Sequence, residues 1–428
     1  MSIVTPSEVL RVPTARPNRA LWTALALLVF SVAINYIDRG NLSVAAPLLQ
    51  KQLTLSSGQL GILLSSFFWT YAAFQLVAGW LVDHYDANWV LLVGFVAWSV
   101  ATAATGLVGG FASLLGLRLL VGIGESVAYP AYSKIFALHY TESHRGMANS
   151  LIDVGCKVGP AIGTLMGGLF IAHFGWRPFF FLLGVGALVW VPFWLKWMPR
   201  GAAHRAVESR AKPSLREILR HPSAWGTFAG LFCANYYWYF LLTWLPSYLI
   251  HERGFSMRTM AWCGSVPFFL CAASTTVVGW LSLRALQRGA STTRVRKGCC
   301  AVGLGLASVI IAVPLLHGAV AAMACLMFAC ICYGVFTTSH WAITQTIAGP
   351  LASGRWTGMQ NFVGNLAGIV APAVTGFVVQ YTGHYFWAFA VAAAVALSGA
   401  LVYIFAIGPI VPACWRCETE LNRDGQPS

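Results

Sequence analysis

Six charged side chains lie inside stretches of this chain that are otherwise apolar. Charge is costly to keep at membrane depth and marks ion or substrate sites there. With all six groups ionised their charges sum to zero, which is the least costly state in a medium of low dielectric constant. An arriving anion would unbalance this set unless an acid took up a proton, so the residue types predict that anion and proton binding favour each other. The six are the cations Arg39, Arg118 and Lys157 and the acids Asp38, Glu125 and Asp153.

Helical spacing groups some of these charges. Arg118 and Glu125 are seven residues apart and share one helix face. Asp153 and Lys157 stand at i and i+4 and can pair directly. Two roles stay open for Lys157. It either binds a second acidic group, such as the far end of a dicarboxylate or a sulfonate-carboxylate, or it stays tied to Asp153 and fixes the spans.

The elements that must position these groups are membrane helices. The 428 residues are 58% hydrophobic and 9% charged, with a mean hydropathy of +0.69, whereas soluble domains carry roughly 25% charge. Apolar runs of about 20 residues recur along the chain, which is typical of helical spans rather than of a barrel. The runs predict an all-α integral membrane protein of twelve spans, beginning near Leu21, Gly58, Trp89, Phe111, Arg145, Phe174, Ala224, Arg258, Arg294, Gly318, Ser353 and Gly383.

Basic residues indicate how the chain is oriented. With twelve spans both termini fall on one side, and that side carries the excess of Lys and Arg, which predicts cytoplasmic termini in the inner membrane. The net charge of +14 therefore sets orientation and argues against a nucleic-acid partner. Ser214 and Glu217 have capping-box spacing and predict a short surface helix. The predicted parts are a tail 1–20, a six-helix bundle 21–198, a linker 199–223, a six-helix bundle 224–407 and a tail 408–428.

Short repeats relate the two predicted bundles. Gly-Trp-Leu at residues 79–81 recurs at 279–281, and Gly-Pro-Ala-Ile at 159–162 recurs loosely as Ala-Pro-Ala-Val at 371–374. Two parallel six-span repeats joined by a basic loop are a transporter pattern. The pattern predicts two pseudo-symmetric bundles with a substrate site between them, near the bilayer midplane.

These motifs resemble a known family. Residues 79–83, Gly-Trp-Leu-Val-Asp, resemble the loop motif of the major facilitator superfamily, although His84 and Asp86 depart from it. Residues 35–41 (Asn-Tyr-Ile-Asp-Arg-Gly-Asn), 118–125 and 361–372 are similar to its anion:cation symporter branch. The resemblance implies a fold of two six-helix bundles and proton-coupled import of a small organic anion by alternating access. The anion would be a sugar acid, a hexuronate, a phthalate-like acid, or a small carboxylate or sulfonate.

The resemblance also implies roles for single residues. Arg39 is the main carboxylate clamp, because its planar fork suits that geometry. Asp38 and Glu125 are the protonatable pair, and Arg118 is the positive charge that compensates them. The resemblance places Tyr71, Trp341 and Asn361 at substrate contacts beside Arg39, and Gly79 and Asp83 in the gating motif. Tyr36 and Lys157 are expected as further contacts from the residues themselves, since a lysine at position 157 departs from the family pattern.

Further patterns give weaker expectations. Gly155, Gly159 and Gly163 predict a close approach of two helices, and the Trp-rich stretch 190–197 predicts an interfacial belt. No HExxH, GxSxG or phosphate-loop motif occurs, which argues against an enzyme or a sensor. We expect no metal and no cofactor, with the proton as coupling ion, and a monomer in the lipid bilayer. An exporter or exchanger on the same fold is the alternative function.

Overall fold

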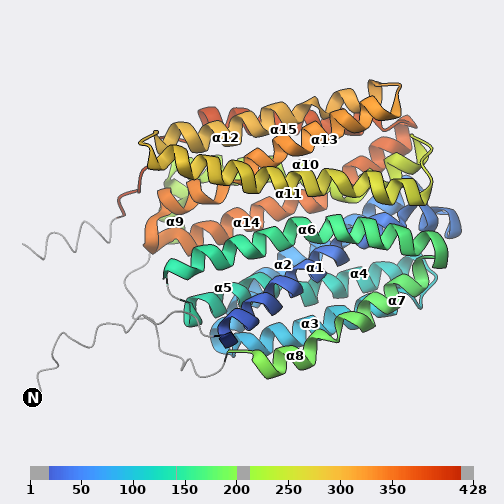
Figure 1. Ribbon diagram of the computed structural model, residues 1–428, viewed down its shortest axis with the longest axis horizontal. Coiled ribbons are helices and arrows are strands. Elements are labelled where there is room, and N and C mark those ends of the chain that lie inside the picture. The colour runs from blue at the N-terminus through green and yellow to red at the C-terminus, as the bar shows by residue number, and fades with distance from the viewer. Residues whose placement is uncertain (1–18, 141, 200–212, 416–428) are drawn as a thin grey trace, which may run out of the picture.

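The computed structural model describes residues 19–140, 142–199 and 213–415. Within these ranges the protein is built of helices without strands, and Figure 1 shows them lying side by side along one direction. In chain order they are α1 (Arg19–Gln52), α2 (Ser57–His84), α3 (Ala87–Thr105), α4 (Phe111–Glu125), α5 (Ala128–His139), α6 (Glu142–Phe174), α7 (Trp176–Ala187), α8 (Trp190–Trp197), α9 (Leu215–Arg220), α10 (Pro222–His251), α11 (Met257–Gln287), α12 (Thr292–Ala307), η1 (Ser308–Leu315), α13 (Ala319–Thr337), α14 (His340–Thr382) and α15 (Phe386–Phe405).

The predicted all-α membrane fold is confirmed. In the described residues ten helical segments are long and apolar enough to cross a membrane. Two further helices, α2 and α10, have 28 and 30 residues, so the architecture is consistent with the twelve expected spans. Helix α14 contains a break at Gly349, whose φ of 63° lies in the left-handed region that favours glycine. This break separates the candidate spans Ala319–Gly349 and Ala352–Thr382. The division of the chain into two domains at the linker stays a prediction.

Helix α6 packs backbone to backbone against α1. A Cβ added at Gly159 would lie 2.7 Å from the carbonyl oxygen of Ala33 and 2.9 Å from Cβ of Tyr36. A Cβ added at Gly163 would lie 3.2 Å from the Ile37 side chain. The predicted close approach is therefore confirmed, and it fixes the segment of α1 that carries the central charges.

Contacts between the two halves of the chain are made by α2 with α14, α6 with α11, and α1 with α10. The backbone N–H of Gly58 donates a hydrogen bond to Oε1 of Gln380 at 2.8 Å, and a Cβ at Gly61 would lie 2.7 Å from the carbonyl oxygen of Pro372. Further along α2, Nδ2 of Asn361 donates to Oε1 of Gln75 at 3.4 Å. Beyond Gln75, no hydrogen bond joins α2 to α14 among the side chains that the structure describes.

The end of the bundle at which Gly58 and Gly61 pack lies opposite the chain termini. The start of α1, the last described residues and α9 lie toward the left of Figure 1. The contacts of Gly58 and Gly61 lie near the start of α2, which follows the far end of α1. The halves are thus packed directly against each other at the end of the bundle away from the termini.

The Trp-rich stretch does not form the expected belt. Trp190 and Trp194 are only 2% and 0% exposed. Their indole N–H groups donate to the carbonyl oxygens of Leu27 at 2.8 Å and Asn88 at 3.3 Å. The prediction is wrong for these two residues, because each indole N–H finds a carbonyl partner inside the bundle and needs no contact with the interface.

The short helix predicted in the linker is confirmed. It is α9, and the Ser214 hydroxyl accepts a hydrogen bond from the backbone N–H of Glu217 at 3.2 Å. Residues 200–212 of the linker and the tails 1–18 and 416–428 lie outside the described residues.

Candidate functional site

The centre of the first half is a buried ion pair between α1 and α4. Nε of Arg39 donates to Oε2 of Glu125 at 3.0 Å. The two side chains are 2% and 0% exposed. Glu125 is the last residue of α4, which ends where the chain turns into α5. A buried pair of this kind is costly to break, because removing either partner leaves an uncompensated charge.

Three aromatic rings surround the Arg39 guanidinium. Its Cζ lies 4.4 Å from the ring centroid of Tyr71, 4.6 Å from that of Tyr36 and 5.1 Å from that of Phe67. Tyr71 stacks on Phe67 at 5.2 Å. Cation–π contacts orient the guanidinium plane and remove it from bulk water. The structure therefore brings two of the predicted contact residues, Tyr36 and Tyr71, directly to Arg39.

Phe67 also belongs to this site, although the sequence reasoning missed it. Cζ of Arg118 lies 5.1 Å from its ring centroid, so one phenyl ring contacts both arginines. Phe67 stands four residues before Tyr71 on α2, which places both rings on one helix face. That i, i+4 spacing was the available signal.

Asp38 and Arg118 complete a group of four charges. Nδ2 of Asn41 donates to Oδ1 of Asp38 at 3.4 Å, and the Asp38 carboxylate interacts electrostatically with Glu125 and Arg118. The four side chains also retain hydrogen-bonding capacity that no described residue satisfies. The atoms are Oδ2 of Asp38, Nη2 of Arg39, Nε of Arg118 and Oε1 of Glu125. Buried polar atoms of this kind are suited to receive protons or an anionic ligand.

Lys157 and Asp153 form a second, separate pair. Nζ of Lys157 donates to Oδ2 of Asp153 at 2.6 Å. No ion pair or hydrogen bond joins this pair to Asp38, Arg39, Arg118 or Glu125 in the described part of the chain. The six charges are therefore arranged as a group of four and a pair, and not as one shared network.

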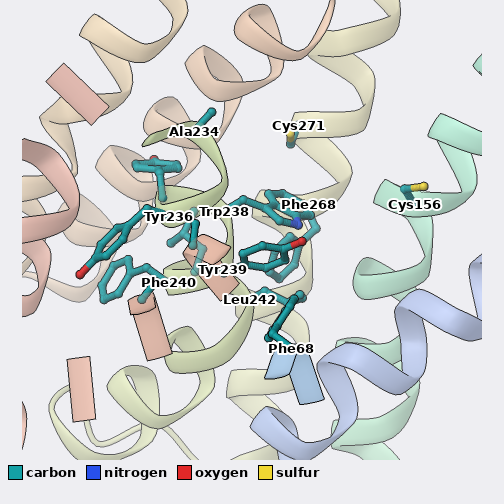
Figure 2. Close-up of a cluster of buried hydrophobic side chains, with 14 of the residues drawn as sticks. Phe68, Cys156, Ala234, Tyr236, Trp238, Tyr239, Phe240, Leu242, Phe268 and Cys271 are labelled. Carbon is teal, nitrogen blue, oxygen red and sulfur yellow. The ribbon is translucent and has the colours of Figure 1, made fainter. Parts of the chain in front are cut away.

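A chain of polar side chains crosses from the second half to the first. The Tyr239 hydroxyl of α10 donates to Oδ1 of Asn365 at 2.8 Å. Nδ2 of Asn365 donates to the carbonyl oxygen of Asn361 at 2.8 Å, and Asn361 reaches Gln75 of α2. The Tyr239 ring also packs on Phe68 of α2, with 4.4 Å between centroids (Figure 2).

Tyr239 was missed by the sequence reasoning. It lies in the aromatic run Tyr236–Phe240, and nothing in the spacing of that run distinguishes the ring that faces the first half. Figure 2 shows the result: Tyr239 lies beside Phe68, whereas Tyr236 points away from it. Only the placement of α10 against α2 makes this distinction.

Trp341, like Lys157 and Asn361, is a predicted contact that no hydrogen bond, ion pair or ring contact joins to Arg39 in the described residues. It is half-buried at the start of α14 and packs on His340, with 4.8 Å between ring centroids. No hydrogen bond or ring contact in the described residues links it to the group of four charges. His340 itself is buried and stacks on Phe336 at 4.9 Å.

One cavity of about 410 Å³ lies away from these charges. It opens at the end of the bundle where α10 begins and α15 ends, and none of the predicted site residues lines it. Its walls include His221, Ser223, Phe405, Pro409, Val411 and Ala413.

Comparison with known proteins identifies the family. The family model described as Major Facilitator Superfamily matches residues 28–372 of the 428-residue chain. The chain belongs to the Major Facilitator Superfamily. It is therefore a multi-pass membrane transporter and not an enzyme.

Relatives of this superfamily protein match over most of its length. It is 32% identical to the hexuronate transporter of Bacillus subtilis over an alignment of 405 residues that covers 90% of this chain and 94% of the relative. It is 32% identical to a probable sulfoacetate transporter of Cupriavidus necator over 407 residues, covering 90% and 94% of the two chains. A D-galactonate transporter of Escherichia coli is 28% identical over 424 residues, covering 93% and 98%.

Solved structures agree in fold. A bacterial homolog of the human lysosomal transporter Spinster, in an inward-facing and occupied conformation, matches with a TM-score of 0.76. The match covers 91% of this chain and 97% of the other at 19% sequence identity. At that identity the match shows the Major Facilitator fold alone.

Only some residues of the superfamily loop motif, at the end of α2, have side chains within the described part of the structure. An added Cβ at Gly79 would meet no atom within 4 Å, and the side chain of Asp83 lies outside the described residues. The departure at Asp86 has a local reason, because its carboxylate caps α3 by accepting the backbone N–H of Asn88 at 2.7 Å. The gating role of Gly79 and Asp83 stays a prediction.

Proposed function

We propose that this Major Facilitator protein imports a small organic anion by proton symport and alternating access. The observation that carries the proposal is the buried Arg39–Glu125 ion pair inside a ring of aromatic side chains. Relatives that match along nearly the whole chain are transporters of hexuronate, sulfoacetate and galactonate. Each of these compounds carries an acidic group that a guanidinium can bind.

The charge balance of the site couples the proton to the anion. While Glu125 is ionised, it occupies Arg39, and an additional anion would leave a net negative charge in the bundle. A proton on Glu125 removes that negative charge, and the substrate carboxylate or sulfonate then compensates Arg39 in its place. Each ligand thus raises the affinity for the other, which is the thermodynamic statement of symport.

The other residues have supporting roles in this proposal. Asp38 is the second protonatable acid, and Arg118 keeps a positive charge beside both acids when the substrate leaves. Tyr36 and Tyr71 hold the guanidinium plane. Asn361 and Trp341 contact the substrate from the second half, and the halves rock about this central site. Both termini face the cytoplasm, the protein lies in the inner membrane as a monomer, and no cofactor other than the proton takes part.

Uptake by proteoliposomes tests the function. Labelled D-galacturonate, D-galactonate and sulfoacetate are supplied outside, with the inside alkaline. We expect accumulation of at least one compound above its equilibrium level, and collapse of that accumulation when a protonophore dissipates the gradient. Accumulation that does not respond to the pH gradient would contradict proton symport. Efflux driven by an opposite gradient would favour the exporter or exchanger.

Two substitutions test the roles of the ion pair. Arg39→Ala should abolish anion binding, because the site loses its clamp and leaves Glu125 buried without a partner. Glu125→Gln imitates the protonated acid, so it should permit exchange of external for internal anion while blocking net proton-driven uptake. Intact net uptake by Glu125→Gln would refute the role of Glu125. Thermal unfolding of both variants checks that they fold.

A further inference from the structure

The Lys157–Asp153 pair of α6 is not needed by the mechanism above. The Lys157 side chain is 8% exposed, whereas that of Asp153 is 43% exposed. Both residues lie on the same helix at i and i+4, so their ion pair ties no two spans together. Pairs with this spacing stabilise a helix only slightly, whereas burying a cation is expensive. A purely structural role therefore accounts poorly for this lysine.

The pair lies where the first half meets the second. Helix α6 packs against α11, and Figure 2 shows Cys156 of α6 and Cys271 of α11 on these neighbouring helices. Lys157 interacts electrostatically with Cys271, and His340 of α14 interacts with both Lys157 and Asp153. The pair thus lies on a helix of the first half that packs against the second half.

A chain of polar contacts runs from Arg39 to Cys156 of α6, the residue before Lys157. The ring of Tyr36 lies under the Arg39 guanidinium, and the Tyr129 hydroxyl donates to the Tyr36 hydroxyl at 3.3 Å. The Tyr129 hydroxyl also lies 2.7 Å from Sγ of Cys156, the neighbour of Lys157 in the chain. The two buried cations therefore lie on α1 and α6, two helices that pack directly on each other.

Asp153 is the fixed negative charge that compensates Lys157. The other titratable groups that act on this pair are Cys156 on its own helix, Cys271 of α11, Tyr333 of α13 and His340 of α14. None of these four is an acid that is anionic at neutral pH in its ordinary state. A neutral hydroxyl that displaced Asp153 would leave the lysine charge uncompensated. Only an anionic group can replace that carboxylate without such a loss.

We propose that the substrate is a small dianion with one acidic group bound by Arg39 and the other by Lys157. This proposal rests on the proposed function of the Arg39 site. The half-exposed Asp153 carboxylate takes up a proton, and the second acidic group of the substrate takes its place beside Lys157. With one proton on Glu125 and one on Asp153, the dianion binds with two protons and the net charge of the bundle does not change.

Binding measurements on the purified full-length protein test the proposal. The probes are sulfoacetate and succinate as dianions, and acetate and D-galactonate as monoanions, titrated by calorimetry at pH 7.5. We expect Lys157→Gln to weaken binding of both dianions about tenfold or more and to leave the monoanions nearly unchanged. Lys157→Arg should retain dianion binding, and Lys196→Gln, which removes an exposed lysine near the end of α8, should change nothing.

The decisive result is the opposite effect of substituting the two partners. Asp153→Asn removes the carboxylate that competes with the substrate, so dianion affinity at pH 7.5 should rise and should depend less on pH. Equal loss of affinity in Asp153→Asn and Lys157→Gln would show a structural pair and overturn the proposal. If Lys157→Gln fails to fold, Lys157→Met, which keeps an apolar stem of similar length without the charge, takes its place in this comparison.

The same titrations separate this proposal from the function on which it rests. If Arg39→Ala abolishes binding while Lys157→Gln binds dianions as the unsubstituted protein does, the second cation site is refuted and the first stands. If the unsubstituted protein binds monoanions as tightly as dianions, the dianion class is refuted. If none of the four probes binds, both proposals fall.

Discussion

At the scale of single residues, Arg39 is held by contacts of two kinds. The ion pair to Glu125 fixes one edge of the guanidinium, and the rings of Tyr36, Tyr71 and Phe67 surround it. Lysine could satisfy the charge but could not match the planar fork and the stacked rings. The residue is thus oriented before a substrate arrives, which lowers the entropic cost of binding.

Tyr239 offers a test of the link between the halves. Tyr239→Phe keeps the ring that packs on Phe68 but removes the donor to Oδ1 of Asn365. We expect uptake to fall about tenfold and the free energy of unfolding to fall by about 1 kcal/mol. The matched control is Tyr403→Phe, because the buried Tyr403 hydroxyl has no hydrogen-bond partner in the described chain. Equal uptake by both variants would contradict a role for the Tyr239 hydroxyl.

At the scale of helices, glycine decides how the site is assembled. Gly155, Gly159 and Gly163 allow α6 to lie directly on the part of α1 that carries Tyr36 and Ile37. Small residues at such contacts let van der Waals packing hold membrane helices together where no hydrophobic force between helices acts. The same contact places the Lys157–Asp153 pair of α6 close to the Arg39 segment of α1.

Adding one methyl group tests this contact. Gly159→Ala would bring Cβ within 2.7 Å of the Ala33 carbonyl oxygen, which requires the helices to separate. Overpacking of this kind costs about 1–3 kcal/mol, so we expect a lower thermal unfolding midpoint together with weaker anion binding. Gly116→Ala in α4 is the control, since an added Cβ there meets no atom within 4 Å. An unchanged midpoint in Gly159→Ala would contradict the close approach.

At the scale of the whole molecule, the two halves pack directly against each other at the end away from the termini. Helix α2 lies against α14 through Gly58, Gly61 and Gly376, and Gln380 accepts the backbone N–H of Gly58. Under the proposed orientation this is the outer face, so the described conformation is closed toward the outside. Alternating access then requires that this glycine contact opens.

Adding bulk at this contact should shift the equilibrium from the conformation closed toward the outside to the one open toward the outside. Gly61→Val places bulk against the Pro372 carbonyl oxygen and the Cα of Gly376, so we expect the outer end to open in a larger share of molecules. Spin labels at Ser56 and Tyr381, in a background without native cysteines, report the distance between α2 and α14 there. We expect a longer mean distance in Gly61→Val, whereas Gly116→Val, at an open position of α4, should leave it unchanged. Identical distances in the two variants would argue against a gate at Gly61.

The amino-acid sequence was sufficient to predict the fold class and the charged residues of the site. Apolar runs of helical length can exist in a bilayer only as helices, because every backbone polar group must be satisfied internally. For the same reason most helices begin within a few residues of the positions predicted, as α2 at Ser57 and α11 at Met257 illustrate. Charges inside such runs are rare and expensive, so Arg39, Glu125 and Lys157 were recognisable before their partners were known.

Local spacing predicted the pairing of Asp153 with Lys157, whereas the other meetings of these groups depend on tertiary packing. The pairing of Arg39 with Glu125 joins residues 86 positions apart, and no local spacing encodes such a contact. Tertiary packing also divided six charges into a group of four and a pair, selected Tyr239 from a run of aromatics, and buried Trp190 and Trp194. The reason is physical: periodicity fixes the face of a helix on which a side chain lies, but only the packing of that face against a particular neighbour fixes its partner.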